Sequence, residues 1–171
     1  MSGMKLAAAA ALAASLMAGG AWAQMSATNP KAPIDVTADG AEVLKDECKS
    51  TWKGDAEALQ NDARLRAHTI TGFFFKKADG CGDMTRLEAD GDVYYVTPQQ
   101  TVRGDHAVYT AGSGTIVVTG NVVVVQGKNV ARGDRLTYQV SSGAMQLDGP
   151  KGRGAGGRVR AVIFPDSAQK P

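Results

Sequence analysis

The sequence predicts an all-β fold, and two observations carry the prediction. Short runs rich in Val, Ile, Thr and Tyr alternate with Gly, Asn, Asp and Pro at spacings of about eight to twelve residues. The chain also repeats itself, because a shift of 29 residues places Arg103-Gly104-Asp105 on Arg132-Gly133-Asp134. Repeats at this spacing indicate stacked β units that together bury one apolar interior.

The start of the chain indicates a cleavable export signal. A basic start at 1–5 precedes an alanine- and leucine-rich run at 6–17, and Ala21-Trp22-Ala23 has the small-x-small pattern of a cleavage site. An ordinary N-terminal helix is the alternative. We therefore predict a signal peptide at 1–23, cut before Gln24, and an exported protein. A flexible segment at 24–32, one β domain at 33–164 and a tail at 165–171 are expected to follow.

Twelve strands are expected within the β domain. One stretch is ambiguous, because residues 55–68 (DAEALQNDARLRAH) contain good helix formers. The repeat favours strand–turn–strand there, since a shift of 66 residues places Gly54 on Gly120 and Arg66 on Arg132, with the turn at 60–62. The predicted strands are 34–37, 42–45, 51–59, 64–71, 85–89, 93–97, 101–110, 115–119, 122–126, 130–140, 144–147 and 158–164.

The repeat also separates two faces of the predicted sheet. Alternate side chains of a strand point to opposite faces, so Val122 and Val124 share one face and Val123 and Val125 the other. Aromatic residues make up only 6% of the chain, so small β-branched side chains line the interior. Such a lining permits either a close-packed sandwich or a groove with room for an apolar ligand.

Charge and composition disfavour several functions. The predicted mature chain has 18 basic and 17 acidic side chains, so no overall field attracts nucleic acid. His68 and His106 are isolated in the sequence, and no serine nucleophile motif or acidic pair stands out, so we expect no enzyme and no cofactor. Cys48 and Cys81 form an even pair in an exported chain, which predicts a disulfide rather than a metal site.

Four segments resemble the OstA-like family: PIDVTADGAE at 33–42, KGDAEALQNDARLRAH at 53–68, VRGDHAVYT at 102–110, and the long block at 115–147 that begins TIVVTGNVVVVQG. The resemblance extends over about 33–164. It implies a V-shaped, slightly twisted β-jellyroll that is open at both edge strands. It also implies a periplasmic carrier that shields lipopolysaccharide acyl chains in an apolar groove and passes them from the inner to the outer membrane.

The resemblance implies partners as well as a ligand. Family members join head to tail and contact inner-membrane-anchored and outer-membrane components of the transport machinery, so a homo-oligomer is also expected. The leader and the end of the chain at Pro171 favour the free bridge component. The expected partner-binding edges are Ile34, Asp35, Val36 and Thr37 at one end and Val159, Arg160, Ala161, Val162, Ile163 and Phe164 at the other.

The predicted groove combines the apolar face of the repeat with the family's lipid contacts, which fall on Ile34, Val36 and Tyr109. Its residues are Ile34, Val36, Val93, Tyr109, Ile116, Val118, Val122, Val124, Leu136, Tyr138, Met145 and Leu147. Candidates for binding lipid phosphates are Arg64, Arg66, Lys76 and Lys77, together with Lys151, Arg153, Arg158 and Arg160 near the end of the chain; ordinary solvated loops are the alternative. The chain departs from the family pattern at its cysteine pair, at an insertion at 73–77 and at a shorter connection at 98–100.

Two motifs suggest other functions. The paired Arg-Gly-Asp tripeptides suggest an adhesive β-repeat protein, but both fall within predicted strands, at glycines where a strand bends or bulges. Residues 152–157 fit G-x-G-x-x-G, although a strand rather than a helix is predicted to follow, so we expect a flexible loop. A non-lipid structural or adhesive protein with a close-packed core is the alternative to the lipid carrier.

Overall fold

The computed structural model describes residues 32–150 and 157–165. The predicted signal peptide, Lys151, Arg153 and the tail beyond 165 lie outside these residues. Ten strands and one 3-10 turn make up the described part, and none of its helices could cross a membrane. The strands are β1 (Asp35–Thr37), β2 (Gly40–Leu44), β3 (Lys49–Gln60), β4 (Ala63–Lys77), β5 (Gly80–Val96), β6 (Thr101–Thr110), β7 (Thr115–Gln126), β8 (Asn129–Gln139), β9 (Met145–Asp148) and β10 (Arg160–Val162), with the turn η1 (Lys45–Glu47) before β3.

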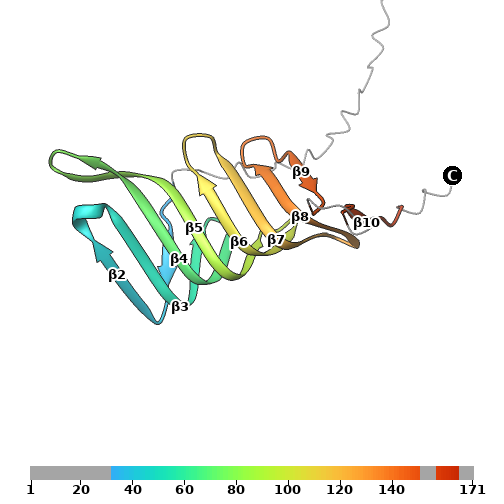
Figure 1. Cartoon of the computed structure of the whole chain (residues 1–171), viewed down its shortest axis with the longest axis horizontal. Coiled ribbons are helices and arrows are strands. Elements are labelled where there is room, and N and C mark those ends of the chain that lie inside the picture. The colour runs from blue at the N-terminus through green and yellow to red at the C-terminus, as the bar shows by residue number, and fades with distance from the viewer. Residues whose placement is uncertain (1–31, 151–156, 166–171) are drawn as a thin grey trace, which may run out of the picture.

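The strands form one antiparallel sheet in the order β1-β3-β4-β5-β6-β7-β8-β10. Two further strands share the same edges: β2 pairs with the first part of β3 while β1 pairs with its second part, and β9 pairs with the second part of β8 while β10 pairs with its first part. The strands lie side by side along the long axis of the molecule, with β2 and β3 at one end and β8, β9 and β10 at the other (Figure 1). This arrangement confirms the predicted open, all-β jellyroll.

The sheet bends where the ladders change register. Three Gly-Asx pairs, Gly54-Asp55 on β3, Gly91-Asp92 on β5 and Gly120-Asn121 on β7, have positive φ at both residues, between 40° and 80°. Glycine adopts this conformation without strain, and Asn and Asp tolerate it better than most residues. Each pair coincides with a register shift against a neighbouring strand, so the three bulges form one fold line across the sheet.

The fold line divides the sheet into two walls. The β2/β9 wall contains β2, β9 and the strand halves that bear Leu87, Val118 and Leu136. The β1/β10 wall contains β1, β10 and the halves that bear Val102 and Val124. Because consecutive strands are antiparallel, the chain crosses from one wall to the other once in each long strand.

The bulges explain two wrong strand boundaries. We predicted breaks between Ala89 and Val93 and between Thr119 and Val122, but β5 and β7 continue through both. Gly-Asp and Gly-Asn pairs favour turns locally, and here the neighbouring strands keep the chain extended on either side of them. The ambiguous stretch at 55–68 is strand–turn–strand, as predicted, within β3 and β4.

The segment at 73–77 is a strand rather than an inserted loop. It continues β4, which we expected to end at Thr71, and pairs with the start of β5 through Phe73↔Arg86 and Lys77↔Gly80. On the outer face of the sheet, the Arg86 guanidinium lies 4.2 Å from the centroid of the Phe73 ring, which is a cation–π contact. Aromatic side chains favour extended backbone, so the three phenylalanines lengthen the β4–β5 hairpin.

A disulfide attaches this hairpin to the neighbouring corner of the sheet. Cys48, which follows η1, is bonded to Cys81 near the start of β5, with the two Cα atoms 5.4 Å apart. Cys48 is buried and Cys81 is exposed. A cross-link between residues 33 positions apart contributes about 3–4 kcal/mol to stability in the chain-entropy model.

Candidate functional site

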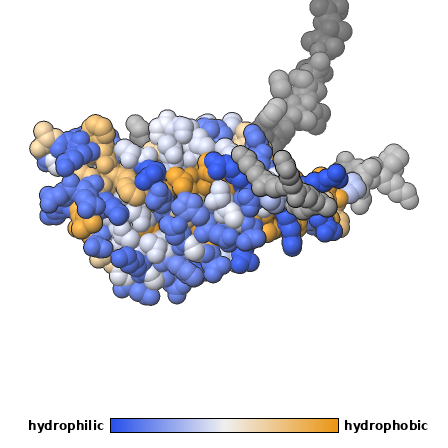
Figure 2. Space-filling view, viewed as in Figure 1, coloured by the Kyte–Doolittle hydropathy of each residue, from blue (hydrophilic) through white to orange (hydrophobic). Residues whose placement is uncertain are grey.

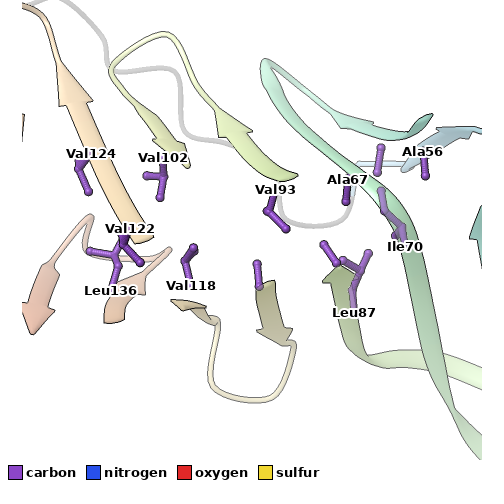
Figure 3. Close-up of a cluster of buried hydrophobic side chains, with 13 residues drawn as sticks. Ala56, Ala67, Ile70, Leu87, Val93, Val102, Val118, Val122, Val124 and Leu136 are labelled. Atoms are coloured by element: carbon purple, nitrogen blue, oxygen red, sulfur yellow. The ribbon is translucent and has the colours of Figure 1, made fainter. Parts of the chain in front are cut away.

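The two walls face each other across an apolar interior. Leu87, Val118 and Leu136 of the β2/β9 wall point toward Val102 and Val124 of the β1/β10 wall (Figure 3). Near the fold line the interior is closed, because Val93 and Val122 have no exposed surface. Each Å² of apolar surface removed from water contributes about 25 cal/mol to the stability of the fold. The buried residues at the base of the V therefore form the stabilising core.

The residues farthest from the fold line are more open. Tyr109, Ile116 and Tyr138 are cross-strand neighbours on β6, β7 and β8, and all three are only partly buried. Each is the inward-facing residue nearest its strand's end, so together they line the mouth of the V. Hydrophobic residues form a broken band along the molecule between hydrophilic surfaces (Figure 2).

An open hollow lies at the β9/β10 end of the interior. Residues from both walls line it, among them Met145 on β9 and Ile163, which follows β10. Met145 is 40% and Ile163 71% exposed, so apolar side chains reach the solvent at this end. A second hollow lies between β8 and β10 on the outside of the sheet, where Val130, Arg132, Arg160 and Val162 line it.

Three tyrosines gather inside the mouth. Tyr95, on β5 in the β1/β10 wall, meets Tyr138, on β8 in the opposite wall, with ring centroids 6.3 Å apart. Burial, with smaller contributions from the neighbouring Tyr138 and Tyr109 hydroxyls, raises the pKa of Tyr95 to about 12. The Tyr95 phenol is therefore neutral at physiological pH and places no charge in the apolar interior.

The predicted groove residues occupy three environments. Val93, Val118, Val122, Val124 and Leu136 are buried in the core. The partly buried members are Val36, Tyr109, Ile116, Tyr138 and Leu147, and the exposed members are Ile34 and Met145. Ile34 precedes β1, and Met145 begins β9, so the exposed members lie at opposite ends of the interior.

Much of the interior is not predicted by the sequence, in particular its small residues. Five alanines are buried in the core cluster: Ala56, Ala58, Ala67, Ala89 and Ala107. Larger members that were also missed are Ile70, Leu87 and Val102, and Trp52, Leu65 and Tyr95 pack against the cluster. The placement of Tyr95 had a signal in the sequence, because it lies two positions after the predicted inward residue Val93. Ala107 had the same signal, because it lies two positions before Tyr109. The other four alanines had none, and alanine itself favours helices.

The phosphate-binding candidates do not form one site. Arg64 and Arg66 lie on β4, where both guanidinium groups pair with the Glu57 carboxylate at 3.6 and 3.5 Å. Lys76 and Lys77 lie instead at the end of the β4–β5 hairpin, and the Lys76 Nζ donates to the Asp46 carbonyl at 3.0 Å. Arg158 and Arg160 are exposed near β10.

A row of arginines on the outside of the β1/β10 wall was not predicted. Successive cross-strand neighbours in it are Arg66, Tyr94, Arg103, Val123, Arg132 and Arg160. Arg103 lies over the Tyr94 ring at 5.4 Å and pairs with Asp92 at 3.2 Å. The position of Val123 in this row shows that it faces outward, opposite Val122.

Both Arg-Gly-Asp tripeptides lie inside strands, in β6 and β8, as predicted. Their glycines fall beside the register shifts of the β6–β7 and β7–β8 ladders. The two histidines are paired rather than isolated, since His106 Nδ1 lies 2.6 Å from an Asp90 carboxylate oxygen and His68 Nε2 lies 3.6 Å from one of Asp92. Within 32–150 and 157–165, no three metal-ligating side chains form a cluster.

The fold and its interior define an open, two-walled β-jellyroll with an apolar lining. Residues 35–144, more than half of the chain, match the family described as LptA/(LptD N-terminal domain) LPS transport protein. The chain therefore belongs to this family, which is a lipopolysaccharide transport family, and the predicted relationship is confirmed.

A solved structure has the same fold. It is that of LptH from Pseudomonas aeruginosa, described as the LptA homologous periplasmic component of the conserved lipopolysaccharide transport device. The two chains are 20% identical and superpose with a TM-score of 0.70, covering 81% of this chain and 99% of LptH. A comparison with curated protein sequences finds no match.

Proposed function

We propose that this protein is a periplasmic carrier of lipopolysaccharide that holds acyl chains between its two walls. The observation that carries the proposal is the partly buried apolar lining at the mouth of the V, formed by Tyr109, Ile116 and Tyr138. Each methylene group that leaves water for such a lining gains about 0.8 kcal/mol. A carrier of this kind needs no catalytic group, and its sugars remain in water.

The binding of the lipid should depend on its acyl chains. We expect the purified protein to bind intact lipopolysaccharide and to bind the deacylated saccharide at least about 100-fold more weakly, a difference of about 2.7 kcal/mol. Titration calorimetry with both ligands, below the aggregation concentration of the lipid, measures this ratio. Equal affinities would assign recognition to the sugars and would contradict a groove for acyl chains.

The edges of the sheet support a bridge built head to tail. At one end β1 and β2 are the outermost strands of the two walls, and at the other end β10 and β9 are. A second copy placed end to end therefore brings β10 against β1 in one wall and β9 against β2 in the other. The walls, and the groove between them, then continue from one copy into the next.

The strand directions are compatible with this joint. β1 and β2 are antiparallel to β3, while β9 and β10 are antiparallel to β8. Because β3 and β8 are separated by five antiparallel steps, they run in opposite directions. In the joint, β10 of one copy would therefore pair antiparallel with β1 of the next copy, and β9 would pair antiparallel with β2. The inner-membrane-anchored and outer-membrane components would use the same edges at the two ends of the bridge.

A further inference from the structure

Tyr95 and Tyr138 make a contact that the sheet order alone does not provide. Tyr95 is on β5 and Tyr138 on β8, so β6 and β7 lie between them in the sheet. Their ring centroids are nevertheless 6.3 Å apart, with the ring planes tilted by 49°. Such an approach is possible because the rings project from opposite walls toward each other.

The contact lies at the mouth of the V rather than at its base. Tyr95 is the last inward-facing residue of β5, which ends at Val96, and Tyr138 is the last of β8, which ends at Gln139. The neighbouring mouth position of β6, Val102, is only 2% exposed. The two walls are therefore in contact at this point, through two rings that are themselves partly buried.

We infer that Tyr95 and Tyr138 form a gate across the lipid groove, closed in the empty protein and parted by an acyl chain that lies between the walls. The inference rests on the proposed function, because it assigns the gate to the same groove. A methylene chain between two rings needs van der Waals contact of about 3.5–4.0 Å with each, so the rings must stand about 7–8 Å apart. The observed 6.3 Å leaves no room for one.

Tyrosine suits such a gate. Its ring gives the apolar contact that closes the mouth, and its hydroxyl gives a polar group where the groove meets water. Because burial raises the Tyr95 pKa to about 12, the phenol stays neutral next to an acyl chain. Tyr109 continues the same surface, since it is separated from Tyr138 along the β2/β9 wall only by Ile116.

Oxidative coupling of the two phenols tests the gate. Photo-oxidation with a ruthenium complex and persulfate removes one electron and one proton from each ring, and two rings in contact then join through a carbon–carbon bond. We expect the empty protein to form a Tyr95–Tyr138 link, identified by peptide mass spectrometry. Tyr95→Phe should reduce intramolecular linking at least tenfold. Tyr94→Phe, its outward-facing neighbour on the same strand, should leave the link intact.

Lipid binding should prevent the Tyr95–Tyr138 link, and the link should in turn weaken lipid binding. Saturation with lipopolysaccharide before illumination should reduce the Tyr95–Tyr138 link at least fivefold, and the linked protein should bind lipopolysaccharide at least tenfold more weakly than untreated protein. Tyr95→Phe protein should bind lipopolysaccharide equally well before and after the same illumination, which controls for other oxidation. Undiminished linking in the lipid complex, or full affinity of the linked protein, overturns the gate. If untreated protein does not bind lipopolysaccharide, the proposed function fails and the gate fails with it.

Discussion

Ile116→Glu is expected to weaken the binding of lipopolysaccharide by about two orders of magnitude at pH 7, whereas Val117→Glu leaves it almost unchanged. Ile116 faces inward at the mouth, between Tyr109 and Tyr138, and Val117 faces outward from the next position of β7. An acyl chain over residue 116 would force the new carboxyl group to become protonated. Protonation of a glutamate with an ordinary pKa of about 4.3 costs about 3.7 kcal/mol at pH 7, which limits the loss to about 500-fold.

The loss of lipopolysaccharide affinity in Ile116→Glu should become smaller as the pH falls. A carboxyl group that is neutral in the complex and charged in the free protein makes binding tighter as the pH falls. At pH 5 the protonation cost is only about 1 kcal/mol, so most of the affinity should return. Calorimetric titration of both variants at pH 7 and pH 5 measures the effect. Equal losses for Ile116→Glu and Val117→Glu would show that the inner face does not contact the lipid.

Proline in β10 is expected to abolish head-to-tail association while the jellyroll remains folded. β10 contains only Arg160, Ala161 and Val162, all of which are exposed, so its loss removes little of the core. Successive residues of an antiparallel strand direct their N–H groups to opposite sides. One of Ala161 and Val162 therefore directs its N–H group to β8, and the other directs it to the free edge. Because proline has no N–H group, one of Ala161→Pro and Val162→Pro detaches β10 from β8, and the other removes a hydrogen-bond donor from the free edge. Both changes should weaken association at least about tenfold, or about 1.4 kcal/mol.

Light scattering across a concentration series measures the association, and thermal unfolding shows that the fold is retained. Val162→Thr is the matched control, because threonine is also β-branched and keeps its N–H group. This variant should associate like the original protein. Unchanged oligomer mass for both proline variants would exclude β10 as the joining edge.

The internal repeat predicted more of this fold than local propensity did. Residues 55–68 favour a helix by composition, yet the shift that places Gly54 on Gly120 predicts the strands that the structure shows. Glycines also caused errors, at Gly91 and Gly120. Gly-Asx pairs are typical of turns, and the sequence does not show that three of them align across the sheet as bulges that fold one sheet into two walls.

The site could be predicted only in part, because the sequence does not show which residues of neighbouring strands lie opposite each other. Inward positions such as Val118 and Leu136 follow from alternation along a single strand and from the repeat. The Tyr95–Tyr138 contact depends on how the walls fold over each other, and the outer arginine row depends on the pairing of six strands, so neither is encoded in a local pattern. The phosphate-binding candidates were chosen by charge alone, and the structure separates Arg64 and Arg66 from Lys76 and Lys77.

Photo-crosslinking from the two faces of the sheet tests the central claim most directly. A photoreactive residue replaces Tyr109, which faces the interior, or Thr137, which lies opposite the outward-facing Val117, in protein exported to the periplasm of a bacterial host. We predict strong adducts with lipopolysaccharide from position 109 and none from position 137. Equal adducts from both positions, or none from position 109 in a folded protein, would contradict a carrier that holds the lipid between its walls.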